Sequence, residues 1–227
     1  PDSAPRSLEG WLPPALPVVF LNSAPGGGAH PSLIVDNRGG ARAMVSHLLS
    51  AGHRRLAIVN GPASNFDAAE RRRGFRDALR AAGIPPDAAV ELAGDFGEES
   101  GEAAGGTIAR LEPRPTAVFA ANDSMAIGVL LALGRAGVAV PAEVVVAGFD
   151  DIPIARFASP PLSTVRHDLR NLGERALSRL LSGIAGERTS PAAREVLPFR
   201  LVLRESTGGA GEESERPPED AIVYGTS

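Results

Sequence analysis

The chain of 227 residues contains no cysteine, no lysine and no long apolar run. Without cysteine it can form no disulfide bond, no thiolate nucleophile and no cysteine-ligated metal site. No segment approaches the ~20 consecutive apolar residues that span a membrane. A basic start followed by an apolar stretch and a cleavage site is also missing, so we predict a cytoplasmic protein without membrane contact. Because the sequence starts at Pro1 and not at methionine, we expect a fragment of a longer protein.

All 23 basic residues are arginine, which we interpret as a compositional bias and not as a phosphate-binding surface. The net charge of −4 comes from the tail Gly209–Ser227, which holds five acidic residues and one arginine. The rest of the chain has 22 acidic residues and 22 arginines. Because protein domains that grip nucleic acid are strongly basic, we expect that this chain does not bind DNA by itself.

Two segments of the chain end in the same way, namely Thr116–Asp123 (TAVFAAND) and Glu143–Asp151 (EVVVAGFDD). Each is a short apolar run, typical of a strand buried on both faces, and each stops at paired polar residues. In an open α/β sheet, ligands bind in the crevice beyond the carboxyl ends of the strands. A carboxylate and an amide at that edge therefore indicate a small-molecule site.

Strand and helix patterns alternate through the middle of the chain. The predicted strands are Arg55–Asn60, Val90–Ala93, Thr116–Ala120, Val144–Ala147 and Val196–Leu203. The predicted helices are Ala68–Ala82, Ser100–Leu111, Ser124–Arg135 and Arg170–Leu181. We expect Gly105-Gly106 to weaken the second helix, Gly137 and Gly183 to end the third and fourth, and Pro198 to place the last strand at an edge or bulge. This alternation predicts βαβ units and a parallel sheet.

The two ends of the chain have a different composition. Pro1–Pro17 is rich in proline and forms at most one short helix around Leu8–Leu12. Pro25–Pro31 is predicted to be a loop, and Gly208–Ser227 to be disordered.

Five stretches in register resemble the effector-binding domain of lactose-repressor-type (LacI/GalR family) bacterial transcriptional regulators. They are Asp36–Pro62, Glu70–Phe75, FAANDSMAIGVL, VVVAGFDDIPIARFASPPLSTVRHDLRNLGERAL and PFRLVLREST. The resemblance extends from Pro17 to Thr207. It implies an α/β, periplasmic-binding-protein-like (type I) fold with a doubly wound parallel sheet, in which two subdomains enclose a ligand.

Measured against the family pattern, the second subdomain is expected to be complete and the first only partial, and the DNA-binding headpiece to be absent. We expect residues 1–37 to be a remnant of the N-terminal subdomain with the first crossing strand, and 38–164 to be the C-terminal effector-binding subdomain. Residues 165–208 then form the crossing segment, helix and strand that return to the N-terminal subdomain, and 209–227 form a disordered acidic tail.

The resemblance implies six effector-binding residues, which are Asn22, Arg71, Phe96, Asn122, Asp150 and His167. A carboxylate can accept two hydrogen bonds from vicinal hydroxyls, and an amide can both donate and accept. A guanidinium fork can grip two oxygens of a sugar or a carboxylate, and an aromatic ring can stack on the apolar face of a sugar. These side chains together suit a sugar-like or nucleoside-like ligand.

Each of these residues also has a structural alternative. Asp150 and Asn122 could cap a turn or a helix, although Asp151 and Asp123 follow them and are expected to be the caps. Arg71 could lie on a solvated helix face, and the other candidates could be ordinary packing residues. A lone histidine is usually structural, and no second ligand lies at metal-binding spacing from His167, so we expect no metal ion and no cofactor.

A homodimer is expected through two apolar segments that the resemblance places at a two-fold interface. The alternative is that the helix packs only on its own sheet. The predicted interface residues are Ile127, Leu130, Leu131, Ile154 and Phe157.

Enzyme motifs are not found, because the sequence has no G-x-S-x-G elbow, no GxxxxGK loop and no GxGxxG after a strand. We therefore hypothesise a non-enzymatic, ligand-sensing and dimerisation portion of a regulator that binds operator DNA through a headpiece absent from this chain. The alternative hypotheses are a soluble sugar-binding receptor of a transport system and a degenerate fragment without ligand. A helix-turn-helix or a signal peptide in the parent gene would separate the first two.

Overall fold

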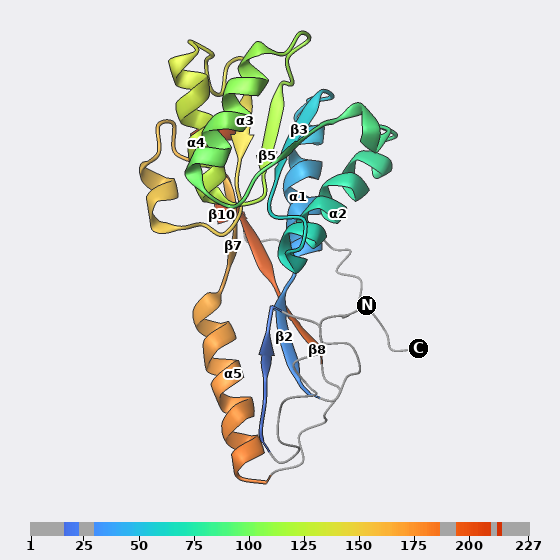
Figure 1. Ribbon diagram of the computed structural model, residues 1–227, viewed down its shortest axis with the longest axis vertical. Coiled ribbons are helices and arrows are strands. Elements are labelled where there is room, and N and C mark those ends of the chain that lie inside the picture. The colour runs from blue at the N-terminus through green and yellow to red at the C-terminus, as the bar shows by residue number, and fades with distance from the viewer. Residues whose placement is uncertain (1–15, 23–29, 187–193, 210–212, 215–227) are drawn as a thin grey trace, which may run out of the picture. The chain divides into compact units, whose positions relative to one another are not determined.

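The structure is a computed structural model that describes residues 16–22, 30–186, 194–209 and 213–214 (Figure 1). The chain divides into two compact units. Unit 1 comprises Pro1–Asp36 and Asp168–Pro198, and unit 2 comprises Asn37–His167 and Phe199–Ser227. The chain therefore passes three times from one unit to the other. Among the helices in the described ranges, none has the length and apolar character needed to cross a membrane.

A four-stranded parallel sheet forms the centre of unit 2, with the strand order β4-β3-β5-β6. These strands are β3 (Leu56–Asn60), β4 (Val90–Ala93), β5 (Ala117–Ala120) and β6 (Val145–Ala147). All of β3 except its last residue, and all of β5 and β6, are buried, as expected for strands covered on both faces. The predicted doubly wound parallel sheet is confirmed in this unit.

Helices cover both faces of this sheet (Figure 1). The helices α1 (Asn37–Ser50) and α2 (Phe66–Ala81) enclose one apolar cluster, which contains Phe75 and Phe119. The other cluster lies under α3 (Glu98–Arg110) and α4 (Asp123–Arg135). The short 3₁₀ helices of this unit are η2 (Pro86–Ala88), η3 (Pro153–Phe157) and η4 (Glu205–Thr207).

The helix α3 is present as predicted, and two of its glycines, Gly101 and Gly105, let α4 approach closely. A Cβ atom on Gly101 would lie 2.1 Å from the carbonyl oxygen of Met125, and one on Gly128 would lie 2.1 Å from that of Glu98. At Gly105 the nearest atom would be Ala132 Cβ, at 2.8 Å. The absence of side chains at these positions therefore brings the two helix backbones together.

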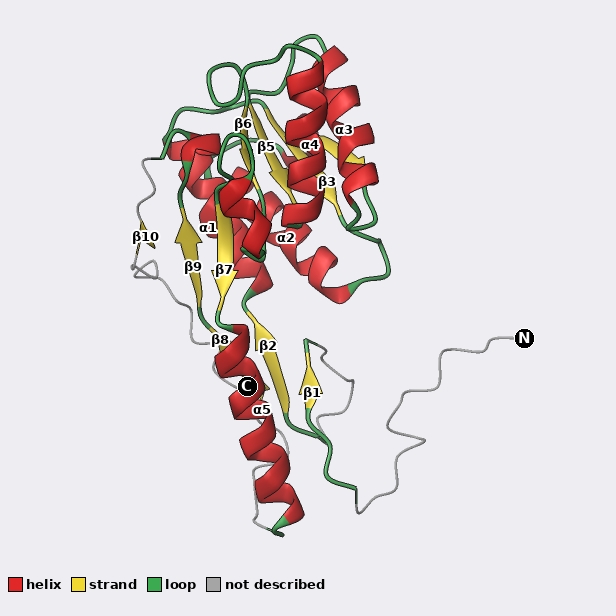
Figure 2. Ribbon diagram, turned by 90° about the vertical axis from the view of Figure 1, so that its left-hand side faces the viewer, coloured by secondary structure: helices red, strands yellow, loops and turns green. Residues whose placement is uncertain are grey.

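The single strand predicted at Val196–Leu203 is wrong, because Pro198 divides it into two strands. The first, β8 (Arg194–Leu197), pairs in parallel with β2, and the second, β9 (Phe199–Val202), pairs antiparallel with β7 (Thr164–His167). A proline cannot donate to a ladder, so the chain changes sheet at this position (Figure 2). On its other edge β9 pairs with β10 (Glu213–Ser214), which lies in the tail predicted to be disordered.

Unit 1 contains a three-stranded sheet of order β1-β2-β8 and the helix α5 (Leu169–Ile184). The strands β1 (Phe20–Leu21) and β2 (Ser32–Val35) are parallel. One face of α5 packs on this sheet through Leu172 and Ala176. Gly183 does not end α5 as predicted; the helix continues past it, and Gly186, with φ of 73°, follows the C-cap Ala185. The predicted helix at Leu8–Leu12 and most of the predicted loop at Pro25–Pro31 fall outside the described residues.

Candidate functional site

The candidate site lies at the carboxyl edge of the unit 2 sheet, where the sequence predicted it. Five of the six predicted residues belong to this unit and lie in one chain of contacts: Arg71, Phe96, Asn122, Asp150 and His167. Asn22 belongs to unit 1, where it follows β1 with φ of 47° and its Oδ1 accepts a hydrogen bond from Val35 N at 3.2 Å. Its predicted contact with the effector stays a prediction.

Arg71 is the centre of the contact network. The helix α2 starts at the N-cap Asn65, whose side chain accepts from Ala68 N, and this start places the arginine in the second turn, on the buried side. The Nε atom donates to Asn37 Oδ1 at 2.8 Å, and Nη1 donates to the carbonyl oxygen of Ala121 at 2.6 Å. Arg71 is therefore not on a solvated helix face, since only 5% of the residue is exposed.

Two further contacts of Arg71 fix its electrostatics. Nη2 lies 3.0 Å from Asp150 Oδ1, and the guanidinium carbon lies 3.8 Å from the centre of the Phe149 ring. Burial lowers the pKa of Arg71, and the carboxylates of Asp150 and Asp67 oppose that shift. Burial also raises the pKa of Asp150, which the positive charge of Arg71 counteracts. Each of the three guanidinium nitrogens thus already has a protein partner.

Asp150 and Asp151 form a turn in an uncommon backbone conformation. Their φ angles are 106° and 53°, a region that non-glycine residues rarely occupy. The prediction that Asp151 is a cap is wrong, because its carboxylate forms ion pairs with Arg166, at 2.5 Å, and Arg204, at 2.7 Å. With the carboxylate of Asp151 held by two arginines, that of Asp150 is the one left partly exposed, at 33%.

The sequence predicted that Asn122 contacts the ligand and that Asp123 caps the following helix, and the second of these predictions is wrong. Asn122 is the N-cap of α4: its backbone is extended and its Oδ1 accepts from Met125 N at 3.0 Å. Its Nδ2 donates to the carbonyl oxygen of Phe96 at 2.9 Å. Because Asp123 is already the first helical residue, its carboxylate leaves the helix end and is fully buried. The use of Asn122 by a ligand stays a prediction.

The Asp123 carboxylate accepts two hydrogen bonds from other parts of unit 2. Oδ1 accepts from Thr164 Oγ1 at 2.6 Å, and Oδ2 accepts from the backbone N of Ile152 at 2.9 Å. Burial raises the pKa of Asp123 to about 7, although both hydrogen bonds lower it. The sequence contained no signal that separated this buried carboxylate from the exposed ones.

Phe96 lies in a loop with φ of 73° and is partly buried against the apolar cluster under α3 and α4. A Cβ atom on Gly61 would lie 2.4 Å from its ring, so the ring packs directly over that glycine. The packing role that we kept as an alternative is therefore present. A stacking role toward a ligand stays a prediction.

Two side chains at this edge have buried polar atoms without a partner in the described part of the chain. Both ring nitrogens of His167 lack a hydrogen bond, and its ring centre lies 4.9 Å from that of Phe149. Burial lowers the pKa of His167 to about 3, so the ring is neutral at physiological pH. Asn60 Oδ1 is the other unpaired atom. Since buried polar atoms are normally hydrogen-bonded, these two side chains are suited to a polar ligand.

Sequence reasoning missed Asn60, although a signal was present. The strand β3 ends in Asn60-Gly61, just as β5 is followed closely by Asn122-Asp123. The carboxyl ends of neighbouring parallel strands lie at one edge of the sheet, so an amide at the end of β3 belongs to the same group.

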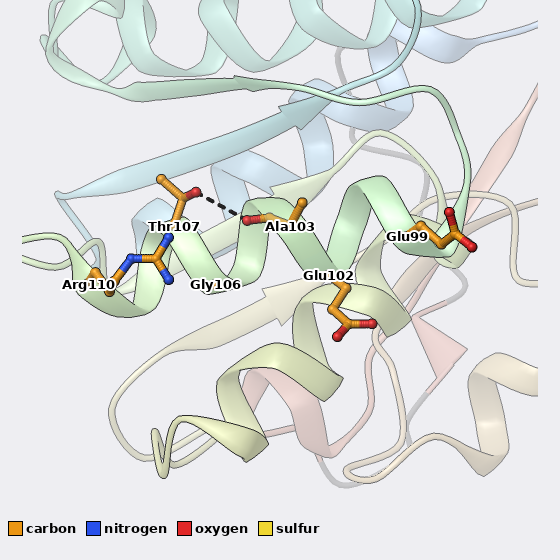
Figure 3. Close-up of a pocket in the computed structure, with 6 residues that line it drawn as sticks. All are labelled: Glu99, Glu102, Ala103, Gly106, Thr107 and Arg110. Carbon is orange, nitrogen blue, oxygen red and sulfur yellow. Dashed lines mark hydrogen bonds between the residues drawn. The ribbon is translucent and has the colours of Figure 1, made fainter.

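A hollow lies along α3 (Figure 3). All of its lining residues come from this one helix: Glu99, Glu102, Ala103, Gly106, Thr107 and Arg110. The Thr107 hydroxyl donates within the helix, to the carbonyl oxygen of Ala103 at 3.1 Å. No second element contributes a polar group to its lining, so this hollow is not a candidate functional site. Within the described residues, no three His, Cys, Asp or Glu side chains are grouped to hold a metal ion.

The predicted dimer residues differ in their exposure. Leu131, Ile154 and Phe157 are 45%, 51% and 72% exposed. Leu130 is buried in the cluster under α4 and Ile127 is partly buried against the same cluster, so their part in a dimer stays a prediction. The helix thus uses these two residues for its own sheet, and the remaining three form what we call the exposed apolar surface.

Comparison with known proteins adds to this picture. Residues 45–207 match the family described as periplasmic binding protein-like domain. The chain is 39% identical over 172 residues to the HTH-type transcriptional regulator CelR of Thermobifida fusca, which covers 76% of this chain and 50% of CelR. The chain thus spans about half the length of this curated relative.

Two solved structures are similar over most of the chain. A complex of the transcriptional regulator CelR with cellobiose aligns with a TM-score of 0.77 and 37% identity, over 83% of this chain and 58% of that one. A lac repressor dimer bound to operator and the anti-inducer ONPF aligns with a TM-score of 0.76 and 33% identity, over 84% and 65% of the two chains.

Proposed function

Because the chain belongs to the periplasmic binding protein-like domain family, in the form of the effector-binding domain of LacI-type regulators, we propose that it senses a small hydroxyl-rich effector. The effector binds at the carboxyl edge of the unit 2 sheet and controls operator binding by a longer regulator. The single observation that carries this proposal is the group formed by Asp150, Arg71 and the unpaired His167 at that edge.

The effector is best explained as an uncharged molecule with several hydroxyl groups. Only 5% of Arg71 is exposed and three of its five N–H donors already have protein partners, so the arginine offers little to a phosphate or a carboxylate. Asp150 is partly exposed and accepts hydrogen bonds, as vicinal hydroxyls require. A negatively charged ligand beside Asp150 would be repelled by its carboxylate, and the charge of Asp67 also acts on Asp150. The cellobiose in the similar CelR complex is an uncharged sugar and supports this choice.

The mechanism is allosteric and involves no chemical reaction. A ligand that contacts both subdomains of such a domain favours one of their relative orientations, and it shifts the population only by its difference in affinity between the two states. In a dimeric regulator this shift alters how two DNA-binding headpieces meet an operator. The lac repressor structure, a dimer bound to operator, supports this proposal, as does the similarity to the transcriptional regulator CelR.

Binding of named sugars tests the proposal directly. Titration calorimetry of this chain, and of the longer protein that contains it, should detect binding of at least one of cellobiose, galactose and ribose. Glucose 6-phosphate should bind more weakly than glucose, because of the carboxylates of Asp150 and Asp67. Tighter binding of the phosphorylated sugar would contradict the proposed effector chemistry.

A further inference from the structure

We propose that Asp123 is a positioning residue for effector binding: its buried carboxylate holds residues 148–152 in the turn that presents the Asp150 carboxylate beside Arg71. The inference rests on the proposed function, since it concerns the same site. It assigns a role to a fully buried charged side chain that packing alone does not explain, because isolated buried carboxylates are costly and are kept where they are paired or hydrogen-bonded.

The hydrogen bonds of Asp123 lie on both sides of the turn. Its backbone N donates to the carbonyl oxygen of Phe149 at 2.9 Å, immediately before the turn. Its Oδ2 accepts from Ile152 N at 2.9 Å, immediately after it. A single residue at the start of α4 therefore fixes the chain just before and just after Asp150 and Asp151.

The turn needs such support because its backbone conformation is unfavourable. Two consecutive non-glycine residues with positive φ are strained, and such a conformation persists only where the surroundings determine it. On the side of β7, Asp150 N donates to the carbonyl oxygen of Val165 at 2.8 Å, and Asp151 N donates to Thr164 Oγ1 at 3.3 Å. That threonine hydroxyl in turn donates to Asp123 Oδ1 at 2.6 Å, so the second of these two contacts from β7 also involves Asp123.

Asp123 can approach the turn closely because residue 148 is a glycine. A Cβ atom on Gly148 would lie 2.2 Å from Asp123 Oδ1, so only glycine leaves room for the carboxylate there. The space that Gly148 leaves open is thus occupied by the group that supports the turn. Removal of that group leaves Ile152 N and the Thr164 hydroxyl without their acceptor inside the protein, which favours a rearrangement of the turn.

The test uses four variants of this chain and first a readout without ligand. The ¹H–¹⁵N signal of the Arg71 side chain reports its environment, and Asp150→Asn provides the reference for a weakened ion pair. Asp123→Ala should move the Arg71 signal toward that reference, and Asp123→Asn, which keeps one acceptor for Ile152 N, should move it less. Ser124→Ala, one residue along the same helix and outside this network, should leave it unchanged. An unchanged Arg71 signal in folded Asp123→Ala would overturn the proposal.

Should Asp123→Ala fail to fold, the wild-type chain provides a second measurement. The Ile152 amide should shift with a pH midpoint of about 7, as Asp123 ionises. The carboxylates that face Asp123 are those of Asp150 and Asp151, and their charges raise the pKa of Asp123. The Arg71 signal should show an inflection at the same midpoint as Ile152. Absence of that inflection would overturn the role of Asp123 in positioning the site.

Binding of cellobiose separates this proposal from the proposed function. Asp123→Ala should weaken cellobiose binding at least about tenfold, with partial rescue in Asp123→Asn, while Ser124→Ala should stay within about twofold of wild type. Equal affinity of Asp123→Ala and wild type would overturn the positioning role. If wild type does not bind cellobiose, the proposed effector chemistry fails for this sugar, and the ligand-free signals alone decide on Asp123.

Discussion

Arg71 and Asp150 form an ion pair of 3.0 Å in which the two side chains differ strongly in exposure, with 6% for the arginine and 33% for the aspartate. The arginine is held from within the protein by Asn37 and by the carbonyl oxygen of Ala121. The aspartate is thus the group presented outward, and the arginine is its support. The sequence predicted a ligand contact for each of these two residues, and did not predict that they pair with each other.

Replacement of Asp150 should affect binding and stability together. Loss of a charged hydrogen-bond partner costs about 1.5–3 kcal/mol, so Asp150→Ala should lose tenfold or more of its effector affinity in calorimetry. The same variant leaves Arg71 buried without its counter-charge, and urea unfolding should show a loss of about 1–3 kcal/mol, since the aspartate is partly exposed. Asp87→Ala, at a side chain 90% exposed, is the matched control and should change neither quantity. Unchanged affinity in Asp150→Ala would remove Asp150 from the site.

The pH dependence of stability should change in His167→Phe. The pKa of His167 is lowered from 6.5 to about 3 in the folded state, so the unfolded chain binds the proton first. Its contribution to stability is therefore complete above pH 6.5 and is lost as the pH falls toward 3. On going from pH 8 to pH 5, the variant should gain about 2 kcal/mol relative to wild type. Parallel stability profiles of the two proteins would contradict a buried neutral imidazole.

Asp123 contributes to the same profile with the opposite sign. Its pKa is raised from 3.8 to about 7 in the folded state. Its contribution is therefore largest at acid pH and is lost as the pH rises through 7. The two effects oppose each other between about pH 4 and pH 6.5. The effect of His167 is therefore isolated by the difference in the free energy of unfolding between His167→Phe and wild type, in which the contribution of Asp123 cancels.

Two glycines of α4 should respond in opposite directions to the same substitution. Gly128→Ala places a Cβ 2.1 Å from the carbonyl oxygen of Glu98 and should destabilise by about 1–3 kcal/mol or more. Gly134→Ala meets nothing within 4 Å and should stabilise by about 0.5–1 kcal/mol, since alanine favours the helix. Denaturant unfolding measures both. Equal effects would show that α3 and α4 are not in close contact in solution.

The exposed apolar surface should carry a homodimer. Leu131→Arg should convert a dimer to a monomer of about 23 kDa in sedimentation experiments at micromolar concentration, because a two-fold contact repeats the introduced charge on both sides of the apolar interface. Leu177→Arg on α5, where the leucine is 57% exposed, is the matched control and should leave the dimer intact. A dimer that survives Leu131→Arg would show that another surface is used, and a monomeric wild type would refute the dimer for this chain.

Specific DNA binding should not be found with this chain alone. Outside its acidic tail the chain has equal numbers of acidic residues and arginines, so it lacks the excess of positive charge on which such binding depends. Fluorescence anisotropy at ~150 mM salt should give no difference between operator and random duplex. A clear preference for operator DNA would contradict this prediction.

Much of the fold followed from local sequence patterns. The apolar strands of unit 2 and the alternation of helix and strand are determined by burial on both faces, so each predicted element from Arg55 to Ala147 is present, with small changes at its ends. The single predicted strand around Pro198 is wrong because its two halves pair with different partners, β2 and β7, and pairing is not a local property. The close contact of Gly105 with α4 is likewise a tertiary contact, which the local sequence around the glycine does not predict.

The candidate site could be predicted in place but not in detail. The edge of the sheet followed from strand-end residues such as Asp150. Which of two adjacent polar residues points into the protein depends on the residue at which the helix starts. Because α4 starts at Asp123, Asn122 is the cap and the Asp123 carboxylate is buried, whereas the sequence predicted Asp123 as the cap. The unpaired nitrogens of His167 depend on packing against Phe149, which the sequence does not state.

The three passages of the chain between units have a consequence for protein synthesis. Unit 2 is completed by its last piece: β9 pairs with β7, Ser163 N donates to Ser206 Oγ at 2.8 Å, and the Ser206 hydroxyl donates to the carbonyl oxygen of Val146 at 2.6 Å. When only the residues up to His167 have emerged from the ribosome, β7 has been made but β9, the strand that pairs with it, has not. Until Phe199–Thr207 emerges, β7 lacks the partner strand that covers its edge, and such an edge is a site for chaperone binding or aggregation.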